Sequence, residues 1–241
     1  MPVILAEDIA DKKEKLLQYA VELFAEHGFD GTSVRMIADK AGMNVAMISY
    51  YYGSKEKMFE EMITQKTAYM RATLHTLTSD KTKDAWEKFQ VLIDHYVERL
   101  MSSKAHFHRI MMRELSLQKR TAITKMIEER LMHNMKAVHG IIQDGVKKKI
   151  FRKDVDYGFI ISTLIGTITH NCSYSSLVSG ILKINGGVNK LSPEEHQAWL
   201  KDHLKELFAC YMLESNYKTK ASRSRSGGSL HDLKSKKKKH K

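Results

Sequence analysis

The residues of this chain best suited to ligating a metal or acting as nucleophiles are its 12 histidines and two cysteines. Zinc sites are commonly built from two histidines spaced as in H-E-x-x-H, or from closely spaced pairs of cysteines. Neither pattern is present, and neither is a glycine-rich phosphate-binding loop. His106 and His108 lie two residues apart, so on a helix their rings point about 200° apart and cannot chelate one ion. We therefore expect no enzyme, no metal site and no cofactor.

Positive charge is the next chemical feature of the chain. Forty lysines and arginines against 28 acidic residues give a net charge of +12, which favours a polyanionic partner such as nucleic acid or an anionic membrane surface. Residues 1–60 hold seven basic and ten acidic side chains, whereas residues 218–241 hold ten and one. This last segment lacks apolar periodicity, so we predict that it is a disordered basic tail.

Composition also restricts the fold. Two prolines and 13 glycines in 241 residues are too few turn residues for a many-stranded β-protein, so we predict an all-α protein. The start of the chain does not resemble a signal peptide, and the longest nearly apolar stretch, residues 159–169, is about half the ~20 residues that a membrane-spanning helix needs. With two cysteines only, a reducing compartment fits best, and we expect a cytoplasmic protein.

Apolar periodicity and helix-capping residues predict about nine helices. The first four run from Asp11 to His27, over TSVRMIADKAG after a cap at Thr32 or Ser33, from Asn44 to about residue 51, and from Ser54 onward. Glycines 28, 42 and 53 end the first three. Further amphipathic helices are predicted near residues 84–102, 104–117, 121–148, 154–181 and 193–214, the last capped by Ser192.

The second and third of these helices are short and joined by a tight turn, as in a helix-turn-helix. Met43, Ile48 and Tyr52 are predicted to face inward and fasten the third helix to the second. The outward side is then unusually apolar and aromatic for a surface that contacts water alone, which favours insertion into a DNA groove.

Three sequence motifs extend this pattern: A-x-x-L-F-A-E-x-G-F, T-S-V-R-x-I-A-x-x-A-G and Y-Y-x-S-K-E. With them, residues 13–63 resemble the amino-terminal DNA-binding domain of the tetracycline-repressor-like (TetR/AcrR) family of bacterial transcriptional regulators. The resemblance implies a three-helix DNA-binding domain at residues 1–53, a larger helical effector-binding and dimerisation domain at 54–217, and the tail at 218–241. It also implies a homodimer that binds double-stranded operator DNA and is released from it by an unidentified small-molecule effector.

The resemblance also assigns residues to DNA contacts. Hydroxyl and ammonium groups would contact phosphate at Thr32, Ser33, Tyr51 and Lys55. Arg35 would read guanine, and the third helix would face base edges or sugar with Asn44, Val45, Ala46, Met47, Ser49 and Tyr50. The family often has a basic residue in place of Val45 and an aromatic residue in place of Ser49, so readout here should depend on methyl contacts, hydroxyls and water.

The remaining assignments come from the family architecture together with residue type. The effector pocket would draw on His95, Tyr96, His108, Met111, Met112, Met135, His139, His170 and Tyr174, because methionines suit adaptable apolar cavities and the polar groups can orient a ligand. The dimer interface would use Gly158, Ser162, Gly166, Trp199, Leu204, Phe208 and Tyr211. The alternative hypothesis is a ligand-independent DNA-binding or architectural protein that uses the basic tail.

Overall fold

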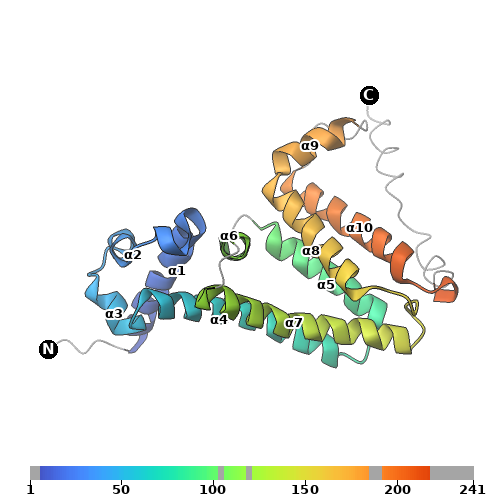
Figure 1. The fold of residues 1–241 in the computed structure, drawn as a ribbon, viewed down its shortest axis with the longest axis horizontal. Coiled ribbons are helices and arrows are strands. Elements are labelled where there is room, and N and C mark those ends of the chain that lie inside the picture. Colours follow the sequence, from blue (N-terminus) through green and yellow to red (C-terminus); the bar gives the residue numbers. More distant parts are fainter. Residues whose placement is uncertain (1–5, 103–105, 118–120, 185–191, 218–241) are drawn as a thin grey trace. The chain divides into compact units, whose positions relative to one another are not determined.

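The computed structural model describes residues 6–102, 106–117, 121–184 and 192–217. These residues form ten helices and one isolated antiparallel bridge between Phe151 and Leu213, so the predicted all-α fold is confirmed (Figure 1). The helices are α1 (Ala6–Gly31), α2 (Val34–Ala41), α3 (Ala46–Tyr52), α4 (Lys55–Ser79), α5 (Ala85–Leu100), α6 (His106–Ser116), α7 (Ala122–Lys147), α8 (Tyr157–Ser173), α9 (Ser175–Ile184) and α10 (Pro193–Met212). The predicted basic tail lies outside the described residues.

One predicted helix, residues 154–181, is two helices instead. Tyr174 separates α8 from α9 because its backbone angles, φ −123° and ψ 38°, are not helical. The surrounding stretch, HNCSYSS, is made of residues with low helix propensity, so little free energy is lost by bending the chain here. Most ends of the other predicted helices lie within a few residues of those in the structure. Helix α1 is the exception, because it starts earlier and ends later than predicted.

The chain divides into two compact units. The first contains the described residues of Met1–Asp80 and Arg99–Val138, and the second contains those of Lys81–Glu98 and His139–Lys241. The first unit therefore joins α1–α4 to α6 and the beginning of α7. It extends well past residue 53, where the resemblance places the end of the DNA-binding domain.

The core of the first unit is centred on three phenylalanines from α1 and α4. The rings of Phe24 and Phe29 are 5.9 Å apart, and each lies edge-on to Phe59 at 5.0 Å. Such aromatic pairs add about 0.5–1.5 kcal/mol each to the free energy gained by burying their area. Ile37 of α2 and Ile48 of α3 are buried in the same cluster, so the short helices are attached to α1 and α4 through one core.

Helix α6 binds the end of α1 through polar groups. Gly28 interrupts α1 with φ +77°, a conformation that favours glycine. The buried carboxylate of Glu114 accepts a hydrogen bond from the backbone N–H of Phe29 at 3.1 Å, and Arg113 donates to the carbonyl of Glu26 at 3.0 Å. A Cβ on Gly28 would lie 2.7 Å from Nε of Arg113, so a larger residue here would make the Arg113 side chain move.

The second unit is built around α5, α8 and α10. Phe89 of α5 and Phe208 of α10 meet edge to face at 5.3 Å, and Leu164 and Ile168 of α8 are fully buried. A buried polar pair links α10 to α8, because His196 Nε2 lies 2.9 Å from Oδ1 of Asn171. The N-cap predicted at Ser192 is present, and Glu195 completes a capping box with it. No helix among the described residues has the length and apolar character needed to cross a membrane.

The buried imidazole of His196 makes stability depend on pH. Burial lowers its pKa from the ordinary value of 6.5, and the pKa of His108 is lowered for the same reason. The unfolded chain therefore binds these protons more readily, so their contribution to stability is complete above pH 6.5 and is lost as the pH falls below that value.

We expect His196→Gln, which retains a donor for Asn171, to lose less stability than the parent between pH 7.5 and pH 5 in urea unfolding experiments. His170→Gln, at an exposed histidine of α8, serves as the control. Parallel pH profiles for the parent and His196→Gln would contradict this assignment.

Candidate nucleic-acid interface

Helix α2 has a well-defined start and end. Its N-cap is Ser33, whose hydroxyl oxygen accepts a hydrogen bond from the backbone N–H of Met36 at 3.2 Å. Its C-cap is Gly42 in the left-handed conformation, φ +66°, and the N–H of Met43 returns to the carbonyl of Ala38 at 2.9 Å. These two caps limit α2 to eight residues, as the sequence predicts.

Helix α3 begins immediately after this turn. The side-chain oxygen of Asn44 accepts a hydrogen bond from the N–H of Ala46, and its carbonyl accepts one from Met47, both at 2.9 Å. Asn44 therefore satisfies backbone donors at the start of α3, although the helix itself starts two residues later. Gly53, with φ +80°, ends α3, and Ser54 caps α4 by accepting from the N–H of Lys57 at 3.2 Å.

The inward side of α3 is the predicted one. Ile48 and Tyr52 are buried, and Met43 packs partly against the same core. The hydroxyl of Tyr52 donates to the carbonyl of Lys13 in α1 at 2.6 Å, and the Lys13 ammonium lies 5.0 Å from the centre of the tyrosine ring. Burial, together with the nearby carboxylates of Glu61 and Glu14, raises the pKa of Tyr52, so its phenol stays neutral. Tyr52 is thus a packing residue.

The opposite side of α3 faces solvent. We name it the α3 face, and its exposed members are Asn44, Val45, Ala46, Ser49 and Tyr50. Tyr50 is 73% exposed, a large fraction for an aromatic residue on a helix with a well-packed inner side. Its ring meets that of Tyr51 edge to face at 5.0 Å, and Tyr51 and Met47 are half-buried at the border of the core.

Two residues predicted to contact phosphate, Thr32 and Lys55, donate hydrogen bonds to backbone carbonyls within the protein. The hydroxyl of Thr32 is buried, with the residue 1% exposed, and donates to the carbonyls of Gly28 and Leu23 at 2.8 and 3.2 Å. Thr32 therefore seals the end of α1 and is dropped as a DNA contact. The ammonium of Lys55 donates to the carbonyls of Phe29 and Thr32 at 3.0 and 2.9 Å, which leaves one of its three N–H groups for another partner.

One cation beside the α3 face was not selected from the sequence. Lys57 is exposed on the first turn of α4, and its ammonium would lie 3.8 Å from a Cβ on Gly53, at the end of α3. In the sequence, only its position two residues after Lys55 indicates that Lys57 lies near the predicted DNA-binding surface. The backbone turn at Gly53 is what brings its charge beside the end of α3. Ser33 and Arg35 are also exposed, whereas Lys40 is paired with Glu22 at 3.0 Å.

The predicted effector residues are spread over both units, so the pocket as a whole stays a prediction. His108 and Met111 are buried in the first unit, where Met112 and Met135 are half-buried. Tyr96 is buried in the second unit, His95 and His139 are half-buried there, and His170 and Tyr174 are exposed and lie against each other at 5.3 Å.

The predicted dimer residues divide into exposed and buried groups. Gly158, Ser162 and Gly166 form an exposed stripe on α8, while Trp199 and Tyr211 are half-buried. Leu204 and Phe208 are 2% and 1% exposed and belong to the core of the second unit, so we drop them as interface residues. Leu200, Leu204 and Phe208 are spaced four residues apart and form the inner side of α10. Leu207, next to Phe208 in the sequence, is exposed on the outer side.

Comparison with known protein families gives a match that covers the elements described above. The family model described as "Bacterial regulatory proteins, tetR family" matches residues 16–62, from α1 into α4. The chain is 29% identical over 137 residues to the probable HTH-type transcriptional regulator YttP of Bacillus subtilis, which covers 57% of this chain and 66% of that protein. It is 26% identical over 165 residues to the HTH-type transcriptional repressor KstR2 of Mycobacterium tuberculosis, covering 66% and 80%.

Solved structures share the fold over most of the chain. The ketosteroid transcriptional regulator KstR2 of Mycobacterium tuberculosis superposes with a TM-score of 0.64 at 20% identity, covering 84% of this chain and 95% of that one. FadR from Bacillus subtilis, solved in complex with stearoyl-CoA, gives a TM-score of 0.58 at 20% identity, covering 80% and 96%. At these identities the likeness concerns the fold.

The two lysines at the start of α4 should differ in their effect on stability. Lys55→Met removes two charged hydrogen bonds to carbonyls and a cation–π contact with Phe29 at 4.3 Å, so we expect a loss of about 1–3 kcal/mol. Lys57→Met, the matched control, should change the free energy of unfolding by less than about 0.5 kcal/mol. Urea unfolding measures both free energies. Equal effects of the two substitutions would contradict the conclusion that the hydrogen bonds of Lys55 to the end of α1 stabilise the fold.

Proposed function

Because the chain belongs to the TetR family of bacterial transcriptional regulators, which are not enzymes, we propose that it is a sequence-specific repressor released from its operator by a small molecule. The observation that carries the DNA-binding part is the α3 face. The inner side of α3 is anchored by Ile48 and Tyr52, while its outer side presents methyl, hydroxyl and aromatic groups to solvent. A short helix held in this way is suited to the major groove.

The proposed contacts follow from exposure and charge. Ser33, Tyr51, the remaining N–H of Lys55 and the ammonium of Lys57 are suited to phosphate groups on either side of the groove. Arg35 is exposed without a carboxylate partner among the described residues and is suited to guanine. Val45, Ala46, Ser49 and Tyr50 are suited to thymine methyls and base edges.

We propose that two chains pair through α8 and α10. The exposed glycines and serine of α8 allow a partner helix to approach closely. Apolar side chains flank them: Phe159 is 54% exposed beside Tyr211, at 5.0 Å, and Leu207 is 48% exposed. A two-fold dimer would place two recognition helices about 34 Å apart, one turn of DNA, on one face of the duplex.

Effector release requires a ligand with different affinities for the two conformations of the regulator. KstR2 is described as a repressor and FadR was solved with stearoyl-CoA, so relatives of this chain combine this fold with repression or with small-molecule binding. We propose the same type of regulation here, and the effector residues predicted from the sequence remain candidates for it. A ligand-independent DNA-binding protein is the alternative outcome of the tests below.

DNA selection tests the assignment of the α3 face. Incubation with random-sequence DNA should retain a defined, two-fold-symmetric site. Tyr50→Ala and Arg35→Ala should then change which sequences are retained, with losses of about 1–3 kcal/mol on the parental site. Lys57→Ala should instead weaken binding to all sequences to a similar extent and reduce its salt dependence.

Lys136→Ala, at an exposed cation on α7, is the control for charge alone. Retention of the same sequences by the parent and by Tyr50→Ala and Arg35→Ala would exclude the α3 face as the specificity element. Addition of cell metabolites to the parental complex should release the DNA. If none does, the ligand-independent alternative holds.

Sedimentation equilibrium tests the dimer. A Cβ on Gly166 meets nothing within 4 Å, so Gly166→Glu fits within the subunit but places a charged side chain where the partner helix would lie. We expect this variant to be a folded monomer with weakened operator binding. Gly140→Glu, at an equally open helical position on α7, should remain dimeric. A dimeric Gly166→Glu protein would show that α8 is not the interface.

A further inference from the structure

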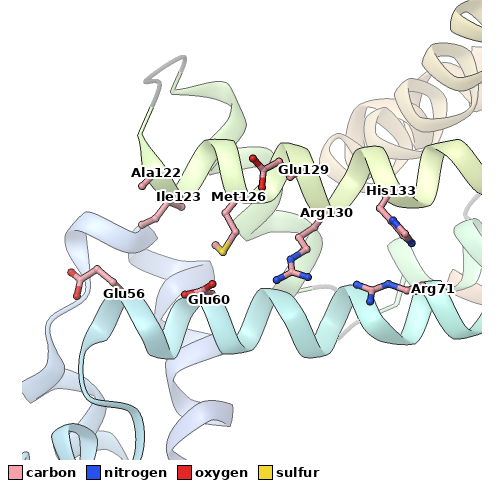
Figure 2. A pocket seen from close by; sticks show the side chains of 9 residues that line it. All are labelled: Glu56, Glu60, Arg71, Ala122, Ile123, Met126, Glu129, Arg130 and His133. Carbon is pink, nitrogen blue, oxygen red and sulfur yellow. The ribbon is translucent and has the colours of Figure 1, made fainter.

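A groove in the first unit lies between α4 and α7 and encloses about 530 Å³ (Figure 2). This volume is within the range of small-molecule sites. We call it the α4/α7 groove; none of the effector residues predicted from the sequence lines it. One face of α4 forms one wall, and one face of α7 forms the other. The lining residues recur at helical spacing on both: Glu60 and Arg71 on α4, and Met126, Arg130 and His133 on α7.

Most charges of the groove are separated along its length; the exception is the exposed Glu129 of α7, which lies next to Arg130 (Figure 2). Figure 2 shows Arg71 reaching from α4, and Arg130 and His133 from α7, into the space between the two helices near one end. Glu56 and Glu60 lie toward the opposite end, where α4 begins. From Glu60 to Arg71 the wall formed by α4 is about 16 Å long, at 1.5 Å per helical residue.

The two arginines have no anionic partner among the described residues. Within the part of the chain that the structure describes, neither Arg71 nor Arg130 makes an ion pair or a side-chain hydrogen bond, and Nε of Arg71 is buried without an acceptor. Buried polar groups in proteins are nearly always hydrogen-bonded, and two nearby cations repel each other. A guanidinium presents a planar set of donors that matches carboxylate and phosphate oxygens. The basic end of the groove is therefore complementary to an anion.

The part of the groove beyond the two arginines is suited to a different chemical group. Met126 and Ile123 of α7 are half-buried and line the wall across from Glu60 (Figure 2). Methionine adapts to apolar ligands of irregular shape. The carboxylates of Glu56 and Glu60 disfavour an anion at the far end, so a ligand with one anionic end has a single preferred orientation.

We propose that the α4/α7 groove binds a small amphiphile, with its carboxylate or phosphate held by Arg71 and Arg130 and its apolar part against Met126 and Ile123. Such a ligand would connect α7 to α4. Helix α4 starts at Ser54, and its Lys55 donates to the carbonyls of Phe29 and Thr32 at the end of α1. An effect of the ligand on DNA binding would pass through this contact; only this regulatory step rests on the proposed function.

Calorimetric titration without DNA tests the binding step. The full chain is titrated with octyl phosphate, octanoate, 1-octanol and inorganic phosphate. We expect octyl phosphate, octanoate or both to bind, 1-octanol not to bind measurably, and inorganic phosphate to bind more weakly than octyl phosphate because it lacks the apolar contact. The stronger of the two amphiphiles identifies the preferred head group.

Matched variants identify the site. Arg71→Gln and Arg130→Gln should each weaken binding by roughly tenfold or more, because each removes charged hydrogen bonds. Lys136→Gln removes the same charge from an exposed position of α7 outside the groove and should bind as the parent does. Without ligand, Arg71→Gln should melt no lower than the parent, since it removes an unpartnered buried donor; an arginine with a structural role would give a lower melting temperature.

Absence of binding by both anionic amphiphiles up to their solubility limit would overturn the proposal. Equal binding of 1-octanol and octanoate, or unchanged affinity in both arginine variants, would overturn it as well. These measurements contain no DNA, so they can succeed where operator selection fails, and the reverse. Operator binding measured with and without the bound amphiphile then tests the regulatory step: an unchanged affinity for DNA would limit the groove to binding alone.

Discussion

The hydrogen bonds around Phe29, at the end of α1, are the constraint on which the first unit depends. Its N–H is bound by the carboxylate of Glu114 from α6, and its carbonyl is bound by the ammonium of Lys55 from α4. The hydroxyl of Thr32 bonds the carbonyl of Gly28 next to it. Backbone groups that α1 leaves unpaired at its end are thus satisfied by side chains from two other helices. The aromatic ring of Phe29 meanwhile packs into the core with Phe24 and Phe59.

This arrangement explains how the short helix α3, which we propose reads DNA, can be held in a fixed position. Helix α3 has seven residues and would not be stable alone. It is fixed by the glycine-containing turns at both ends, by buried Ile48 and by the hydrogen bond from Tyr52 to α1. Helix α4 begins directly after Gly53 and is tied to the same end of α1 through Lys55, so the contact of α4 with α1 helps to set the position of α3. The α4/α7 groove lies along that helix, which makes it a suitable place for a ligand to act.

Local signals in the sequence predicted the short helices and turns around α3 well. Gly42, Asn44, Gly53 and Ser54 each act on neighbouring backbone, so the end of α2, both ends of α3 and the start of α4 could be predicted from residue type and spacing. The inward position of Ile48 and Tyr52 followed from helical periodicity in the same way. The family resemblance then supplied roles for the exposed residues, which periodicity alone does not give.

Features that depend on distant residues could not be predicted. A hydroxyl before a helix indicates a cap, but Thr32 is buried because Gly28 redirects the end of α1 toward it. The carbonyls that occupy Lys55 belong to residues more than 20 positions earlier. Arg71 and Arg130 converge only because α4 and α7 lie side by side, and Leu204 and Phe208 proved to be core residues because α10 packs its inner side within the second unit.

Photo-cross-linking from position 50 tests the central claim most directly. A photoreactive phenylalanine analogue replaces Tyr50 in the full chain bound to its selected operator, and position 140, exposed on α7, carries it in the control. We predict cross-links from position 50 to bases in two half-sites about 10 base pairs apart, and none from position 140. Tight operator binding with no cross-link to bases from position 50 would contradict the assignment of α3 as the DNA-reading helix.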